Sequence, residues 1–190
     1  MVLASDIRPG SAIRYESKLY KVMEAEYHPG QGKMGGQTHA RLKNLETGTF
    51  WETSLRADLK LEEVQLDRKA MDFLYADADS GYFMDPENFE QVAVPLSVIG
   101  PQARFLLPEK RFPVESIDGR PVSVQFPDHM EVRITDTAPP AHQQVDSAWK
   151  PAKLENGVEV MVPQFIKTGD AIRVDLENLR YVDRAKGGKY

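Results

Sequence analysis

The stretch best suited to chemistry is residues 28–37, which hold four glycines and one lysine in ten positions. Glycine has no Cβ and visits positive φ freely, so this segment can turn sharply and lie close against another molecule. Lys33 stands near the apex, where its ammonium can contact a phosphate or receive a covalent extension. The backbone around it is formed by Pro29, Gly30, Gly32, Gly35 and Gly36. The alternative interpretation is an exposed hairpin loop with a solvated lysine.

Two nucleotide-binding interpretations of this loop are excluded by the sequence around it. Residues 30–35 match the Gly-x-Gly-x-x-Gly pattern of dinucleotide-binding folds. That fingerprint needs a helix starting at the glycines, whereas the residues that follow alternate in polarity as a strand does. A kinase glycine loop would need a longer chain and a catalytic His-Arg-Asp segment, which the sequence lacks.

Other reactive residues form no recognisable catalytic or metal-binding set. The four histidines show no paired ligand spacing, so we expect no metal site; they are His28, His39, His129 and His142. Acidic residues between 77 and 90 could supply an acid and a base, but a solvated acidic surface with a helix cap is the favoured explanation. No serine elbow or Walker loop occurs. We therefore expect a protein that is not an enzyme.

The elements that position the loop are predicted to be strands. Residues 12–22 form two short strands around Glu16 and Ser17, and residues 38–45 alternate as a half-buried strand does. Residues 112–117 and 121–126 flank Asp118-Gly119, which predicts a tight hairpin. Further strands are expected at residues 130–135, 159–162, 171–176 and 180–182.

Helix is scarce in these patterns. Asp85, Pro86 and Glu87 carry the signals of a helix start, because Asp caps amides, Pro suits the first position and Glu favours the positive end of the dipole. We expect one short helix there and another near residues 101–105. Many short strands with close turn signals predict an all-β chain of small barrels.

Composition bounds the domain count and the compartment. The chain has 190 residues, a formal charge of −5, 41% apolar residues and no Cys, which excludes a disulfide framework and a thiolate zinc site. Breaks are expected near residues 63 and 127, giving domains 1–62, 63–127 and 128–190. The N-terminus lacks a secretory signal and no apolar run is long enough to span a membrane, so a cytoplasmic protein is expected.

Positive charge is concentrated locally in this acidic chain. Nine basic and eight acidic side chains give residues 1–62 a charge of +1, while residues 63–127 and 128–190 carry −5 and −1. Residues 28–43 contain Lys33, Arg41 and Lys43 and no carboxylate. The basic stretch therefore coincides with the glycine-rich loop.

The C-terminal third carries a long and specific motif. Residues 150–169, which read KPAKLENGVEVMVPQFIKTG, resemble the C-terminal signature of bacterial translation elongation factor P. Residues 6–10, 40–48, 82–85, 118–122 and 181–184 also resemble that family. The likeness covers nearly the whole chain. It implies an SH3-like (KOW-like) barrel followed by two OB-fold barrels, in an L-shaped arrangement that imitates a transfer RNA.

The resemblance also implies a function. Proteins of this family bind the 70S ribosome between the P and E sites and help peptide bonds form when consecutive prolines stall synthesis. The implied partners are the ribosome, the P-site peptidyl-tRNA and ribosomal RNA, without a membrane. The protein is expected to act as a monomer. Arg41 and Lys43 are candidate RNA contacts beside the loop.

Lys33 matches the basic residue that the family carries at the loop tip, which is often covalently extended. The usual bacterial loop resembles Pro-Gly-Lys-Gly, whereas Gln31 follows Pro29-Gly30 here and lengthens the loop. Residues 32–35 are similar instead to the Gly-Lys-His-Gly loop of the eukaryotic and archaeal hypusine-containing factor. The resemblance implies no cofactor, but a covalent modification of Lys33 by a lysine-modifying enzyme.

One loop departs from the family pattern. A Pro-Gly-Leu-Lys-Gly-Asp-Thr-like segment that faces the E-site codon is replaced by residues 138–147, in which only Asp146 and Ser147 echo it. These two residues are candidate codon contacts. A general single-stranded nucleic-acid-binding protein made of OB folds is the alternative function; it should show a basic groove with interleaved aromatic side chains, and the −5 charge argues against it.

Overall fold

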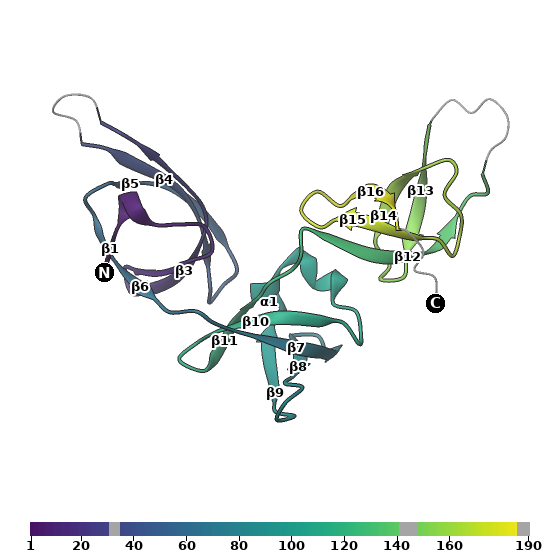
Figure 1. The fold of residues 1–190 in the computed structure, drawn as a ribbon, viewed down its shortest axis with the longest axis horizontal. Helices are drawn as coiled ribbons and strands as arrows, with labels where there is room; N and C mark the ends of the chain where they lie inside the picture. The colour runs from purple at the N-terminus through teal and green to yellow at the C-terminus, as the bar shows by residue number, and fades with distance from the viewer. Residues whose placement is uncertain (31–34, 141–147, 186–190) are drawn as a thin grey trace. The chain divides into compact units, whose positions relative to one another are not determined.

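The chain is an all-β protein, as the sequence patterns predict. The computed structural model describes residues 1–30, 35–140 and 148–185. It separates into two compact units, Met1–Gln125, which holds two antiparallel sheets, and Phe126–Tyr190, which holds one (Figure 1). Within the described ranges, no helix is long and apolar enough to cross a membrane. The three-domain division at residues 63 and 127 stays a prediction.

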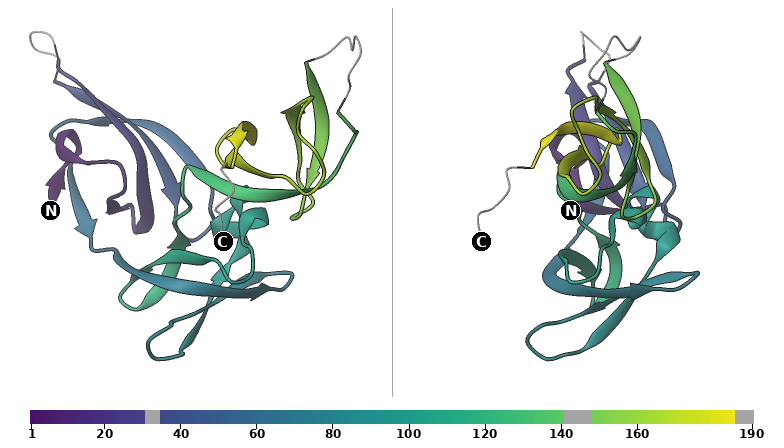
Figure 2. Two further views of the ribbon diagram at one scale, coloured as in Figure 1. Left: turned by 45° about the vertical axis from the view of Figure 1, so that its right-hand side comes forward. Right: turned by 90° about the vertical axis from the view of Figure 1, so that its right-hand side faces the viewer.

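The first sheet contains six strands in the order β1-β6-β2-β3-β4-β5. Their bounds are β1 Val2–Leu3, β2 Ala12–Tyr15, β3 Lys18–His28, β4 Gln37–Asn44, β5 Phe50–Arg56 and β6 Lys60–Val64. The turn at Glu16 and Ser17 has φ of 48° and 64°, so the two short strands predicted around it are confirmed. The sheet curls around a core that includes Ile13, Val22 and Leu42, all fully buried (Figure 2).

The second sheet contains five strands in the order β11-β10-β7-β8-β9. Their bounds are β7 Asp67–Ala76, β8 Ser80–Met84, β9 Gln91–Pro95, β10 Arg111–Ile117 and β11 Arg120–Val124. Helix α1 (Leu96–Ile99) follows β9, and a 3₁₀ turn (Pro101–Phe105) occupies the second predicted helical segment. The hairpin at Asp118-Gly119 is confirmed, with φ of 50° and 75°.

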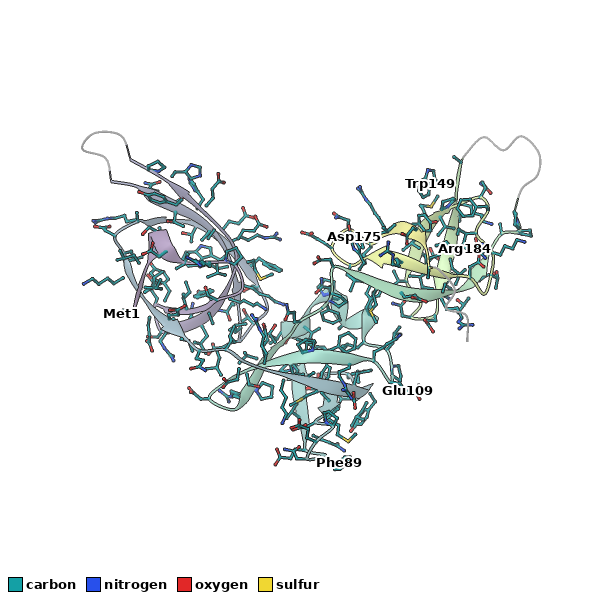
Figure 3. All side chains as sticks on the ribbon, viewed as in Figure 1. Met1, Phe89, Glu109, Trp149, Asp175 and Arg184 are labelled. Atoms are coloured by element: carbon teal, nitrogen blue, oxygen red, sulfur yellow. The ribbon has the colours of Figure 1, made fainter. Side chains whose placement is uncertain are left out.

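The helix predicted at Asp85 is wrong. Asp85 does cap, since its Oδ1 accepts from the Glu87 amide at 2.9 Å, but the segment closes only one turn, with Phe89 N–H donating to the Asp85 carbonyl. The reason is register: Met84 of β8 pairs with Gln91 of β9, which leaves six residues to reverse the chain. Phe89, at φ 62°, ends the turn and is exposed at its outer end (Figure 3).

The second unit is a five-stranded sheet in the order β14-β13-β12-β15-β16. Its strands are β12 His129–Thr137, β13 Trp149–Leu154, β14 Glu159–Pro163, β15 Ala171–Asp175 and β16 Arg180–Arg184. Four of them match the strands predicted for this region, and β13 was not predicted. Alternate residues of these strands point inward and form the core, with Val132, Ile134, Leu154 and Ile172 at its centre.

Candidate functional site

The glycine-rich segment joins the two longest paired strands of the first sheet. Strands β3 and β4 run side by side up to the pairs Tyr27↔Thr38 and His28↔Gln37 (Figures 1 and 2). Pro29 and Gly30, on one side, and Gly35, on the other, are exposed and outside regular structure. Lys33 and Gly32 lie outside the described residues. The structure therefore gives the stem of the predicted loop but not its tip.

Gly36 is closely packed at the base of the loop, and a larger residue there would displace the Tyr27 ring. A Cβ on it would lie 2.7 Å from Cε2 and 2.8 Å from Oη of Tyr27, and 3.1 Å from the His28 carbonyl oxygen. Its own carbonyl accepts from the Ala57 amide at 2.9 Å, which ties the loop base to the turn after β5. Gly35 differs, because a Cβ there would meet nothing within 4 Å.

Polar rings cluster beside the end of this stem. The rings of His28 and His39 meet edge to face at 4.7 Å, and Nδ1 of His39 shares a hydrogen bond of 2.6 Å with the Ser54 hydroxyl. Tyr27, about half exposed, alternates with His28 along β3 and lies on the other face of the strand. In the part of the chain that the structure describes, no three His, Cys, Asp or Glu residues come close enough to hold a metal ion. The cluster can donate and accept hydrogen bonds at the loop base.

Arg41 is paired with carboxylates that neighbouring strands supply. Its Nη1 lies 3.2 Å from Oε1 of Glu24 on β3, and its Nε lies 3.9 Å from Oε1 of Glu52 on β5. The guanidinium also lies 4.7 Å from the centre of the exposed Phe50 ring. The linear sequence shows no carboxylate among residues 28–43, but the sheet places two beside Arg41 and pairs its charge.

Lys43 faces the second sheet. Its Nζ donates to the Ile99 carbonyl at 3.4 Å, and burial, followed by the nearby Lys21 ammonium, lowers its pKa. Its role as an RNA contact stays a prediction. The alternative function, a nucleic-acid binder, needs a basic groove with interleaved aromatic side chains. Arg41, Lys43 and Phe50 do not form such a groove, because Arg41 is paired with Glu24 and Lys43 donates to the Ile99 carbonyl.

Sequence reasoning missed the residues that join the two sheets of the first unit. Glu115 of β10 is fully buried; its Oε2 accepts from Lys21 of β3 at 2.5 Å and its Oε1 from Arg68 of β7 at 2.9 Å. A Cβ on Gly48, at φ 75°, would lie 2.1 Å from the Ser97 carbonyl oxygen of α1. Glu115 follows the core residue Val114 on β10, so its side chain points to the other face of the sheet, and strand alternation predicts that this face is exposed. The first sheet covers this face and buries Glu115.

The second unit holds the other candidate contacts. Asp146 and Ser147 lie outside the described residues. At the edge of that gap Thr137 donates its hydroxyl to the Pro151 carbonyl at 2.9 Å, and the buried Lys150 ammonium donates to the Ala138 carbonyl. These bonds fix the ends of β12 and β13, between which residues 138–147 run.

Three family models together cover almost the whole chain. They are the Elongation factor P (EF-P) KOW-like domain over residues 3–61, the Elongation factor P (EF-P) OB domain over 66–124, and Elongation factor P, C-terminal, over 130–184. Elongation factor P of Acidithiobacillus ferrooxidans is 36% identical over 186 residues, covering 97% of this chain and 99% of that protein. Elongation factor P of Symbiobacterium thermophilum is also 36% identical, covering 97% and 100%.

A solved structure gives a weaker likeness. Eukaryotic translation initiation factor 5A from Methanococcus jannaschii is 16% identical, with a TM-score of 0.48 over 65% of this chain and 90% of that one. This likeness adds nothing to the family assignment.

The chain has three barrel-like domains, one KOW-like and two of OB type, and a glycine-rich loop between paired strands. This combination is that of a non-catalytic translation factor. The chain belongs to the elongation factor P family.

Proposed function

We propose that this protein binds the 70S ribosome between the P and E sites and relieves stalling at consecutive prolines by positioning the P-site peptidyl-tRNA through Lys33. The observation that carries the proposal is the stem of the loop. Strands β3 and β4 stay paired to His28 and Gln37, and the residues between them include four glycines and a lysine with no carboxylate. We infer from this composition that the segment carries a cation at the end of a paired support.

The proposed mechanism is entropic and uses no nucleophile. Proline has a restricted backbone and lacks an amide N–H. A nascent peptide that ends in proline therefore reacts slowly, and its P-site tRNA spends time in unproductive positions. The Lys33 ammonium, together with amides of the loop, holds the CCA end and its phosphates in a reactive position. A tenfold gain in rate needs only about 1.4 kcal/mol, which a few such contacts supply.

A lysine-modifying enzyme is proposed to extend Lys33, which would lengthen the reach of its side chain. No dissociable cofactor is needed, and the protein acts as a cytoplasmic monomer. The half-exposed Arg41 is the proposed ribosomal RNA contact on the loop stem, with Lys43 as a second proposed contact at the opposite end of the stem. Asp146 and Ser147 are the proposed contacts to the E-site codon.

The test is a reporter whose expression requires translation through consecutive prolines, in cells that lack their own factor. Lys33→Ala should abolish most of the stall relief while ribosome binding weakens only partly. The matched control is Lys60→Ala, since Lys60 is an exposed lysine of the same sheet on strand β6. Full stall relief by the Lys33 variant would refute the assignment.

A further inference from the structure

The two strands that carry the loop are anchored at their opposite ends. Lys21 of β3 and Lys43 of β4 are directly paired across the sheet. Lys21 donates to the buried Glu115 carboxylate of β10, and Lys43 donates to the Ile99 carbonyl of α1, so one contact reaches the second sheet and the other the helix that follows β9. Two cations placed opposite one another repel, and the Glu115 carboxylate compensates that repulsion. The base of the loop stem is therefore held by side-chain contacts outside its own sheet, in addition to the backbone pairing within it.

The buried carboxylate is shared between the two sheets. Arg68 lies beside Glu115 on the neighbouring strand of the second sheet and would suffice to pair it. Lys21 reaches the other carboxylate oxygen from the first sheet, and Arg68 in turn donates to the Gly10 carbonyl, in the turn before β2, at 3.2 Å. Without Lys21 the Glu115 carboxylate would keep Arg68 but its buried Oε2 would lose its hydrogen-bond donor, so the set favours the arrangement that completes it.

Apolar packing accompanies these bonds but is less directional. Ala12 and Leu45 from the first sheet form a buried cluster with Ile117 and Val122 from the second. Apolar contacts of this kind tolerate small rotations, whereas charge-assisted hydrogen bonds fix distance and angle. The polar contacts are therefore more directional than the apolar cluster, and the close backbone contact of Gly48 with Ser97 adds to them.

We propose that Glu115 is a positioning residue, which locks the first sheet onto the second through Lys21 and Arg68 and so fixes where the β3–β4 stem carries its loop. The seven steps from Lys21 to His28 span about 23 Å at strand rise, so a rotation of about 10° at the base moves the loop end by about 4 Å. That displacement is large compared with hydrogen-bond tolerance. The consequence for the loop rests on the proposed function; the lock itself does not.

The lock can be measured on the free protein. The chain has no Cys, so spin labels on Lys60→Cys in β6 and Gln91→Cys in β9, both exposed, would report the distance between the two sheets by pulsed electron resonance. The test variants are Glu115→Gln and Lys21→Met. The second keeps Glu115 paired with Arg68 inside the second sheet, so it remains informative if the first fails to fold. Asp72→Asn is the control, because Asp72 pairs with Arg111 on the same sheet but away from the joint.

The labelled parent and the Asp72 control should give one narrow distance distribution, and the test variants should give a broadened or split one. A purely structural role would lower the unfolding midpoint and leave the distribution of the folded molecules unchanged. A narrow distribution in Lys21→Met, or a broad one in the parent, would overturn the proposal. Stall relief by the same variants should fall with the broadening. The spin-label distances are measured on the free protein, without the ribosome. They therefore test whether Glu115 locks the two sheets together even if Lys33→Ala leaves stall relief unchanged.

Discussion

Replacement of Gly48 by alanine is expected to damage the joint between the two sheets. Gly48 lies in the turn between β4 and β5, at φ 75°, and its Cα faces the backbone of α1. A methyl group there would lie 2.1 Å from the Ser97 carbonyl oxygen and 3.1 Å from the Val98 Cα. Both contacts are to backbone, so no side chain can swing away to relieve them.

The expected cost has two parts that can be separated. Alanine at positive φ costs about 1–2 kcal/mol of folding free energy wherever it occurs. The clash adds about 1–3 kcal/mol, because the turn and α1 must move apart by more than ordinary packing allows. Gly119→Ala isolates the first part, since Gly119 has the same φ of 75° and a Cβ there would meet nothing within 4 Å.

Urea unfolding followed by tryptophan fluorescence and circular dichroism measures both variants. Gly48→Ala should lose about 1–3 kcal/mol more than Gly119→Ala, the difference being the clash. Equal losses in the two variants would refute the inference that the turn after β4 is pressed against α1 in solution.

Three further outcomes are expected. Gly36→Ala should reduce stall relief, by about tenfold if about 1.4 kcal/mol of positioning is lost, while Gly35→Ala leaves it intact; equal activity of the two would contradict the steric role of Gly36. The Lys69 ammonium, and next a backbone amide, hold the pKa of Asp85 below its ordinary 3.8. The ionised Asp85 carboxylate stabilises the fold above pH 3.8, and this stabilisation is lost as the pH falls through the lowered pKa. Asp85→Asn should therefore reduce the fall of the unfolding midpoint at acid pH, and an unchanged fall would contradict this role of Asp85. Leu42→Ala should cost about 2–5 kcal/mol in urea unfolding, because Leu42 is fully buried in the first core; a loss below about 1 kcal/mol would count against that burial.

Local sequence patterns predicted the elements whose determinants are local. Asp118-Gly119 predicted its hairpin because positive φ is a property of those two positions, and polar alternation predicted β4 because one face of the sheet is buried. The same local signals misled at Asp85. Its cap chemistry is present, but the pairing of Met84 with Gln91 leaves no room for a helix.

Features that depend on a second sheet were not predictable from alternation. Glu115 lies on the polar face of β10 and becomes buried only because the first sheet covers it. Residues 28–43 were likewise predicted to be basic because no carboxylate occurs among them. Glu24 and Glu52 lie outside that range and reach Arg41 from neighbouring strands. Contacts between residues distant in sequence need the pairing of strands to be known first, and periodicity does not supply it.

The most direct test of the proposed function is photo-crosslinking from position 33. A benzoylphenylalanine placed there, in ribosomes stalled on consecutive prolines, should attach to the 3′-terminal nucleotides of the P-site tRNA. Attachment to the protein's own first sheet instead, with no adduct to tRNA, would contradict the proposal that the β3–β4 stem delivers this residue to the peptidyl-tRNA.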